Sequence, residues 1–139
     1  MTNAHKAAIL DHYYGGGDLS RPATIWIGLS TTTPTDTGAN FTEPIGNGYV
    51  RLELANNTDT WNDATADDPS EKTNKIEFTF AEASGAWGTI THWGLFTQEE
   101  DGICVEWAEL QDSKVIGNGD TPRFKVGEFK SILQNAAGE

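Results

Sequence analysis

Hydrophobic and polar residues alternate along several short stretches of the chain, and a period of two is typical of β-strands that bury one face. The alternation is clearest in YVRLEL (residues 49–54) and in KIEFTF (75–80), where every second residue is apolar. ATIWIGLS (23–30) is rich in β-branched and aromatic residues, which strands favour. Glycine, asparagine, proline and aspartate separate these stretches as turn signals. The pattern predicts about seven or eight short strands.

The first residues follow a different pattern, which predicts one short helix over residues 3–14. Ala7, Leu10 and Tyr14 share a face because they are three and four residues apart. Three consecutive glycines at residues 15–17 end the helix. No second long helical pattern follows to connect parallel strands. We therefore expect an all-β fold, an antiparallel β-sandwich of the jelly-roll type with one short N-terminal helix.

The chain has 139 residues, which fit a single domain with a core of its own. We divide it into the helix with its glycine hinge (1–17) and the β-sandwich (22–133). The single cysteine, Cys104, excludes an internal disulfide, and we interpret it as a small core residue. Apolar runs are only a few residues long, and the first ten residues lack the hydrophobic segment of a secretory signal, so we expect no membrane span.

The net charge of the chain argues against some classes of binding partner. The formal net charge is −12, from 21 acidic and nine basic residues. Such a chain has no basic stripe to neutralise phosphates, which argues against binding to nucleic acid or to an anionic membrane. High negative charge favours solubility, and it would suit display of many copies that must not associate at random.

The decapeptide WGTITHWGLF (87–96) contains the densest group of aromatic residues. As a strand it would place alternate residues on opposite faces. One face would carry Trp87, Thr89, Thr91, Trp93 and Leu95, and the other Gly88, Ile90, His92, Gly94 and Phe96. Both faces mix large and small side chains, so we expect a strand that is covered on both sides. The glycines within it leave room for a neighbouring ring or a bend.

His92 is the one group in this strand that suggests chemistry. Metal-binding patterns such as H-x-H or HExxH are absent, and the other histidines, His5 and His12, lie seven residues apart on the helix. No G-x-S-x-G motif accompanies it, and Ser84 is typical of a turn. We interpret His92 as a hydrogen-bonded structural residue and expect neither catalytic residues nor a bound metal.

Two loops are candidate ligand sites. Residues 59–71 concentrate carboxylates, but they lack the order of a calcium-binding EF-hand loop because Trp61 occupies its third position and no glycine follows. A solvated acidic loop is the favoured interpretation, with a loose calcium or magnesium site as the alternative. The turn at residues 117–120 lacks the Lys-Ser/Thr of a phosphate loop, which argues against a nucleotide. We expect no cofactor.

Five tryptophans raise the question of carbohydrate stacking. Trp26 and Trp107 lie in alternating stretches beside small residues, so we assign both to the core. Trp61, set among polar residues, is the best candidate for an exposed ring. Packing against a neighbouring subunit is an equal alternative to ligand binding at this position.

The order of these pieces resembles a family of small tailed-bacteriophage virion proteins, usually labelled tail fibre or virion structural proteins. The matching pieces are AAILDHYYGG near the start, RPATIWIGLSTTTPTDTG followed by EPIGNGYVRLEL, KIEFTFAEASGAWGTITHWGLF, and WAELQDSKVIGNGDTPRFKVGEF. Family members share a helix with L-D-H, a G-x-G-Y-x-R turn and strand, and a W-G-T-x-T-H strand. They also share an S-K-x-x-x-x-G-D-x-x-x-F hairpin. The resemblance covers nearly the whole chain.

The resemblance implies a non-enzymatic component on the outside of a phage particle, assembled in the host cytoplasm. Our leading expectation is a capsid decoration (cement) protein that binds the major capsid protein or other virion proteins as a homotrimer. One alternative is a tail or head fibre component that contacts the host surface, and another is a carbohydrate-binding module that recognises a host-surface glycan. These alternatives differ in how many copies each particle carries.

We expect the partner interface to include Tyr13 and Tyr14 on the helix, with Trp61 as a third candidate. Large aromatic side chains with a polar tip are enriched at protein interfaces. The alternative for the helix is that it covers one open end of the sandwich.

Overall fold

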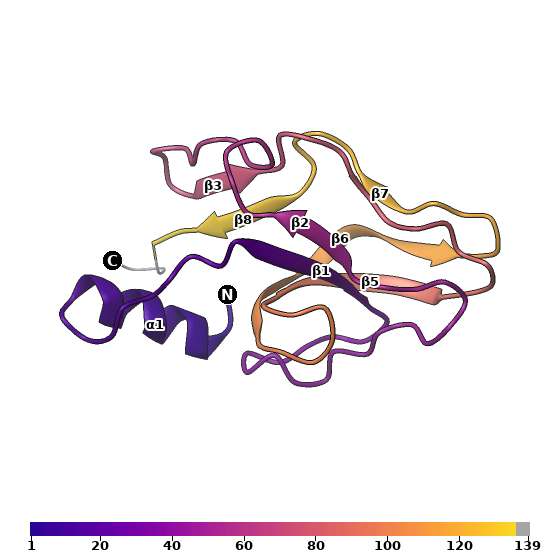
Figure 1. The fold of residues 1–139 in the computed structure, drawn as a ribbon, viewed down its shortest axis with the longest axis horizontal. Coiled ribbons are helices and arrows are strands. Elements are labelled where there is room, and N and C mark those ends of the chain that lie inside the picture. Colours follow the sequence, from indigo (N-terminus) through magenta and orange to yellow (C-terminus); the bar gives the residue numbers. More distant parts are fainter. Residues whose placement is uncertain (136–139) are drawn as a thin grey trace.

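The computed structural model describes residues 1–135, and residues 136–139 lie outside the described part (Figure 1). This part contains one helix, α1 (Asn3–Tyr13), and eight strands: β1 (Thr24–Ser30), β2 (Leu52–Ala55), β3 (Ser70–Thr73), β4 (Phe78–Thr79), β5 (Gly88–Phe96), β6 (Cys104–Ile116), β7 (Arg123–Phe124) and β8 (Lys130–Leu133). The predicted all-β class, the number of strands and the single N-terminal helix are confirmed.

The strands form one main sheet and two short ladders, and every pairing is antiparallel. The main sheet has the order β2-β1-β5-β6, so that β6 is an edge strand, and the ladders pair β3 with β8 and β4 with β7. Gly28 lies opposite Gly94, and Leu95 lies opposite both Ile27 and Glu106. The second layer of the sandwich therefore consists of two ladders instead of a second broad sheet.

Aromatic rings fill the space between the layers. Phe129, just before β8, is fully buried, and its ring centroid lies 4.2 Å from that of Trp93 and 5.5 Å from that of Phe78. The buried core continues over the main sheet through Ile27, Leu29, Leu54, Ile90, Leu95 and Ile116. Burying such side chains contributes roughly 1.5–3 kcal/mol each, so this cluster is a major source of the favourable free energy of folding.

Strand β5 departs from strict alternation at one point. The pairing with β6 shifts register between Ile90 and His92, as in a β-bulge. The extra residue turns Ile90 to the core face, where it joins Trp93. The sequence expectation that Ile90 shares a face with His92 is therefore wrong, because a bulge reverses the sense of the alternation.

The other face of the main sheet is covered by the β1–β2 loop, residues 31–51. The ring of Phe41 lies against the bare backbone at Gly94, where an added Cβ would be 2.6 Å from it. The Phe41 and Phe96 rings meet edge to face with centroids 4.9 Å apart. The expectation that β5 is covered on both sides is confirmed, and the space left by Gly94 is filled by a phenylalanine.

Trp26 and Trp107 do not belong to the core. Both are half-buried; Trp26 lies opposite Phe96 and so shares the face that the loop covers. The Nε1–H of Trp107 donates to the carbonyl of Thr35 at 2.7 Å. The assignment of both residues to the core is therefore wrong. They do lie in strands, but the loop that covers their face of the sheet leaves both rings partly exposed.

Candidate functional site

Helix α1 is held at its start and is only partly covered along its length, with His5, Ala8 and Ile9 half-buried. The buried side chain of Thr2 donates to the carbonyl of Cys104 at 2.9 Å, and the Thr2 backbone N–H donates to the carbonyl of Val105 at 3.0 Å. None of the eleven helical residues is buried, and the helix lies beside the strands at one end of the molecule (Figure 1). A helix this short is marginal in water without packing, so coverage by another protein would stabilise it.

The two tyrosines proposed as anchors lie at the free end of this helix. Tyr13 and Tyr14 are 78% and 77% exposed, and their rings meet edge to face with centroids 5.1 Å apart. Leu10, one turn earlier, is 57% exposed. The glycines that follow turn back on the helix, since the backbone N–H of Leu19 donates to Nδ1 of His12 at 3.2 Å. The geometry leaves Tyr13 and Tyr14 accessible, and their role at an interface stays a prediction.

Trp61 lies inside the molecule, so its expected exposure is wrong. Only 7% of the residue is exposed, and its ring meets those of Phe78 and Phe129 at centroid distances of 5.2 and 5.8 Å. Its polar neighbours in the sequence suggested exposure. The chain instead folds back and pairs Trp61 with Asn74 in an isolated β-bridge, which brings the ring inside. The indole Nε1–H of Trp61 donates to no acceptor within residues 1–135, and such a buried donor costs about 1–3 kcal/mol.

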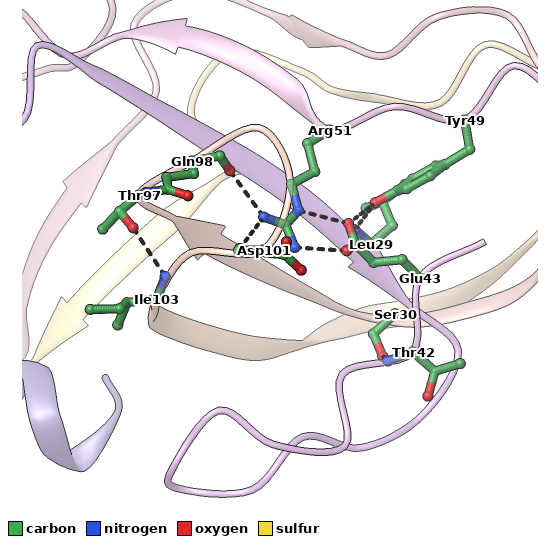
Figure 2. Close-up of polar contacts among 10 residues, drawn as sticks. All are labelled: Leu29, Ser30, Thr42, Glu43, Tyr49, Arg51, Thr97, Gln98, Asp101 and Ile103. Carbon is green, nitrogen blue, oxygen red and sulfur yellow. Dashed lines mark hydrogen bonds and ion pairs between the residues drawn. The ribbon is translucent and has the colours of Figure 1, made fainter. Parts of the chain in front are cut away.

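A polar network holds the β1–β2 loop against the sheet (Figure 2). Arg51 forms a two-pronged ion pair with Glu43, with Nε–Oε1 and Nη2–Oε2 distances of 2.9 and 2.8 Å. Tyr49 donates its hydroxyl hydrogen to Glu43 at 2.6 Å and accepts the backbone N–H of Leu29 at 2.9 Å. Burial, followed by the charge of Glu43, raises the pKa of the Tyr49 hydroxyl. The loop is thereby fixed to β1.

The same arginine also fixes the β5–β6 turn, residues 97–103. Nη1 of Arg51 donates to the carbonyls of Gln98 and Asp101 at 3.0 and 2.8 Å (Figure 2). Within the turn, the backbone N–H of Ile103 donates to the hydroxyl of Thr97 at 3.0 Å. One buried side chain thus joins two loops that are far apart in sequence.

The G-x-G-Y-x-R motif supplies Tyr49 and Arg51 of this network, whereas Glu43 precedes it; the sequence alone assigned the motif no role beyond a turn and a strand. Gly46 and Gly48 have φ angles of 71° and 77°, which a side chain would disfavour. Between them, the backbone carbonyl of Asn47 accepts the indole N–H of Trp87 at 2.8 Å. The side-chain amide of Asn47 donates to the carbonyl of Ala86 at 2.9 Å. The motif thus connects the loop to the start of β5.

His92 is buried on the loop-covered face of the sheet. Its Nδ1 lies 2.7 Å from the hydroxyl of Thr91, and its ring lies edge to face on Trp107. Within residues 1–135, no carboxylate pairs with it. The same part of the chain contains no group of three or more His, Cys, Asp or Glu residues that could hold a metal ion, the acidic segment 59–71 included. The geometry is that of a packed, hydrogen-bonded histidine.

The residues that carry the family resemblance therefore have structural roles in fixing loops to the sheet. A comparison with family models agrees with the resemblance. The family model described as podophage GP4 fiber I protein gp80 matches residues 1–131. The chain belongs to the Gp80 family. It is accordingly a structural component of a phage virion, as the resemblance implied. None of the curated proteins matches the chain. Within residues 1–135, no helix has the length and apolar character needed to cross a bilayer.

Proposed function

We propose that the chain is a non-enzymatic fibre subunit of a podophage virion, attached to neighbouring virion proteins through helix α1. The observation that carries the fibre role is the match of residues 1–131 to a family described as a fibre protein. This match favours the fibre alternative over capsid decoration, which the sequence had placed first. Contact of the fibre with the host surface belongs to the same proposal.

The surface of α1 supports its role in attachment. The end of α1, with Leu10, Tyr13 and Tyr14 exposed, offers an apolar and aromatic patch to a partner. The rest of the surface belongs to a chain of net charge −12, which keeps copies apart where no specific contact is made. We propose a homotrimer as the assembled state, since fibres and decoration proteins commonly sit on threefold axes.

Copy number and position in the particle test the fibre role. Gel densitometry of purified particles against the major capsid protein should give a small number of copies, and gold-labelled antibody should mark the tail or a fibre in electron micrographs. A copy number comparable to that of the major capsid protein, with label spread over the head, would favour capsid decoration and refute the proposal.

Substitution of the helix patch tests attachment. The Y13A/Y14A variant should keep the thermal stability of the parent protein, because both side chains are exposed, but it should be lost from purified particles. The matched control is V115A/V126A, which shortens two exposed apolar side chains, 76% and 61% exposed, away from the helix. Normal incorporation of Y13A/Y14A would place the attachment surface elsewhere.

A further inference from the structure

A groove of about 630 Å³ opens along the side of the sandwich where β6 forms the edge of the main sheet. It lies between the second half of β6 and residues 122–130, because β7 pairs with β4 and leaves the two layers unjoined on this side. Its floor is apolar and includes the core residues Phe80, Ile90 and Ile116. Such a floor can receive an apolar side chain from a partner.

The rim of this groove is basic, although the chain as a whole is strongly acidic. Four of the nine basic residues line the groove, against two of the 21 acidic residues. The four are Lys114, Arg123, Lys125 and Lys130, and the acidic two are Asp112 and Glu128. Arg123 and Lys130 pair with carboxylates of their own chain. Within residues 1–135, Lys114 and Lys125 form no ion pair, and both are exposed. The rim therefore offers two cations to an anionic partner.

The combination of an apolar floor and a basic rim limits what can occupy the groove. A simple anion would leave the floor unfilled, and a neutral apolar molecule would leave the cations without a partner. A nucleic acid would be repelled by the two carboxylates of the rim and by a net charge of −12. A short acidic peptide turn that also carries an apolar side chain matches both the floor and the rim.

The β5–β6 turn, residues 97–103, is such a segment on the surface of this same chain. It contains three consecutive acidic residues, Glu99 to Asp101, all exposed, and Ile103 follows with 61% of its surface exposed. Hydrogen bonds from Arg51 and between Thr97 and Ile103 fix the shape of the turn before any contact is made. A preformed turn loses less conformational entropy on binding than a flexible segment does.

The turn and the groove lie at opposite ends of the β5–β6 hairpin. The turn follows Phe96, whereas Ile116 of the groove pairs with Gly88 at the other end of β5. From Ile103 to Lys114 the strand extends by roughly 35 Å, so the turn cannot reach the groove of its own chain. A contact between these two surfaces must join different copies head to tail, and a repeated contact of this kind gives a closed ring or an open filament.

We propose that the groove binds the β5–β6 turn of a second copy of this chain. The carboxylates of Glu99 and Glu100 pair with the rim, where Lys114 and Lys125 are the available cations. Ile103 contacts the apolar floor. Two copies of net charge −12 repel each other, but salt screens that repulsion beyond about 8 Å at physiological ionic strength, whereas charges in direct contact still attract. The proposal goes beyond attachment through α1 and does not depend on the fibre role.

Charge reversal on each side tests the contact. In sedimentation velocity up to about 1 mM, a range that includes weak contacts, the parent protein should form a species larger than one chain. The E99K/E100K and K114E/K125E variants should each associate at least about tenfold more weakly, because like charges then meet across the contact. E99K/E100K should do so although it lowers the net negative charge.

Matched controls reverse the same number of charges at exposed positions outside the turn and the groove. These controls are E53K/E82K for the turn and K6E/R21E for the groove, and both should associate as the parent protein does. A parent protein that stays monomeric would overturn the proposal. Equal weakening in the controls would show that only the net charge matters and would also overturn it.

Mixing the two charge-reversed variants tests the head-to-tail pairing itself. E99K/E100K keeps a basic groove and K114E/K125E keeps an acidic turn, while the reversed surface of each matches the reversed surface of the other. An equimolar mixture should therefore associate about as strongly as the parent protein, which would also show that both variants fold. A mixture that associates as weakly as each variant alone would refute the contact. That result would leave the fibre role, which copy number and labelling test, unaffected.

Discussion

The guanidinium carbon of Arg51 lies 3.6 Å from the centre of the Phe96 ring, on the loop-covered face of the main sheet. The same group pairs with Glu43 through two nitrogens and donates to the β5–β6 turn. Only 7% of the Arg51 side chain is exposed. Stacking and two-pronged pairing both need a flat guanidinium, which an ammonium group does not provide.

The Arg51→Lys substitution is therefore expected to destabilise the protein by about 2–4 kcal/mol, because it leaves the mostly buried Glu43 without its two-pronged partner. Urea unfolding followed by tryptophan fluorescence measures the change. The control is Arg123→Lys, since Arg123 forms an exposed ion pair with Glu77 at 3.5 Å and should change stability by less than about 1 kcal/mol. Similar unfolding midpoints for the two variants would contradict this role for Arg51.

The contact between Phe41 and the backbone of β5 predicts a penalty at Gly94. An added Cβ would lie 2.6 Å from the Phe41 ring and 3.0 Å from the Phe96 ring, so Gly94→Ala should destabilise the protein by about 1–3 kcal/mol. Gly17→Ala is the control, because nothing lies within 4 Å of its Cβ position, and it should be neutral or stabilise by about 0.4–1 kcal/mol. Thermal unfolding of both variants gives the comparison, and equal melting temperatures would refute the close packing.

Burial raises the pKa of the Glu106 carboxyl above its ordinary value of 4.5, and the hydrogen bond from Ser131 offsets part of the rise. Between the ordinary value of 4.5, which applies to the unfolded chain, and the raised pKa of the folded protein, the folded protein binds more protons than the unfolded chain. The free energy of unfolding therefore falls as pH rises from 4.5 through the folded pKa. Glu106→Gln keeps an acceptor for Ser131 and removes the charge. The free energy of unfolding of Glu106→Gln, minus that of the parent protein, should therefore be larger at pH 7 than at acid pH.

Urea midpoints measured across this pH range test the role of Glu106. Glu109→Gln, an exposed position on the same strand, is the control and should leave the pH profile nearly unchanged. A constant difference in stability between Glu106→Gln and the parent at all pH values would contradict the assignment.

The thiol of Cys104 should be inert in the folded protein. It is 7% exposed, and burial raises its pKa to about 11, so the reactive thiolate is scarce at neutral pH. Reaction with an aromatic disulfide reagent, followed by absorbance, should be slow in buffer and fast in urea. Equal rates in the two conditions would show that the thiol is accessible in the native state.

The sequence predicted the elements of the fold well because their signals are local. The strand at 23–30 and the helix at 3–14 depend on residue type and period, and the structure places them at Thr24–Ser30 and Asn3–Tyr13. The bulge in β5 was missed because it depends on how β5 meets β6. No residue in the stretch from Ile90 to His92 signals the shift of register.

The candidate site was harder to predict, because exposure depends on which distant segments cover a residue. Trp61 is buried by Phe78 and Phe129, which lie far along the chain. The exposure of Tyr13 and Tyr14 agrees with what an interface needs, but a period of apolar residues does not reveal whether a helix face is covered. The roles of Glu43 and Arg51 likewise emerge only when two loops meet.

The position of β6 at the edge of the main sheet bears on how two copies of this protein can meet. From Trp107 to Val115 its outer side makes no backbone hydrogen bond within residues 1–135, and such an unpaired edge can recruit a strand from another molecule. This stretch carries Glu109, Asp112 and Lys114, and charged side chains on an edge discourage that addition. We therefore expect the unpaired edge of β6 to resist adding a strand from a second copy, so that association depends on other surfaces.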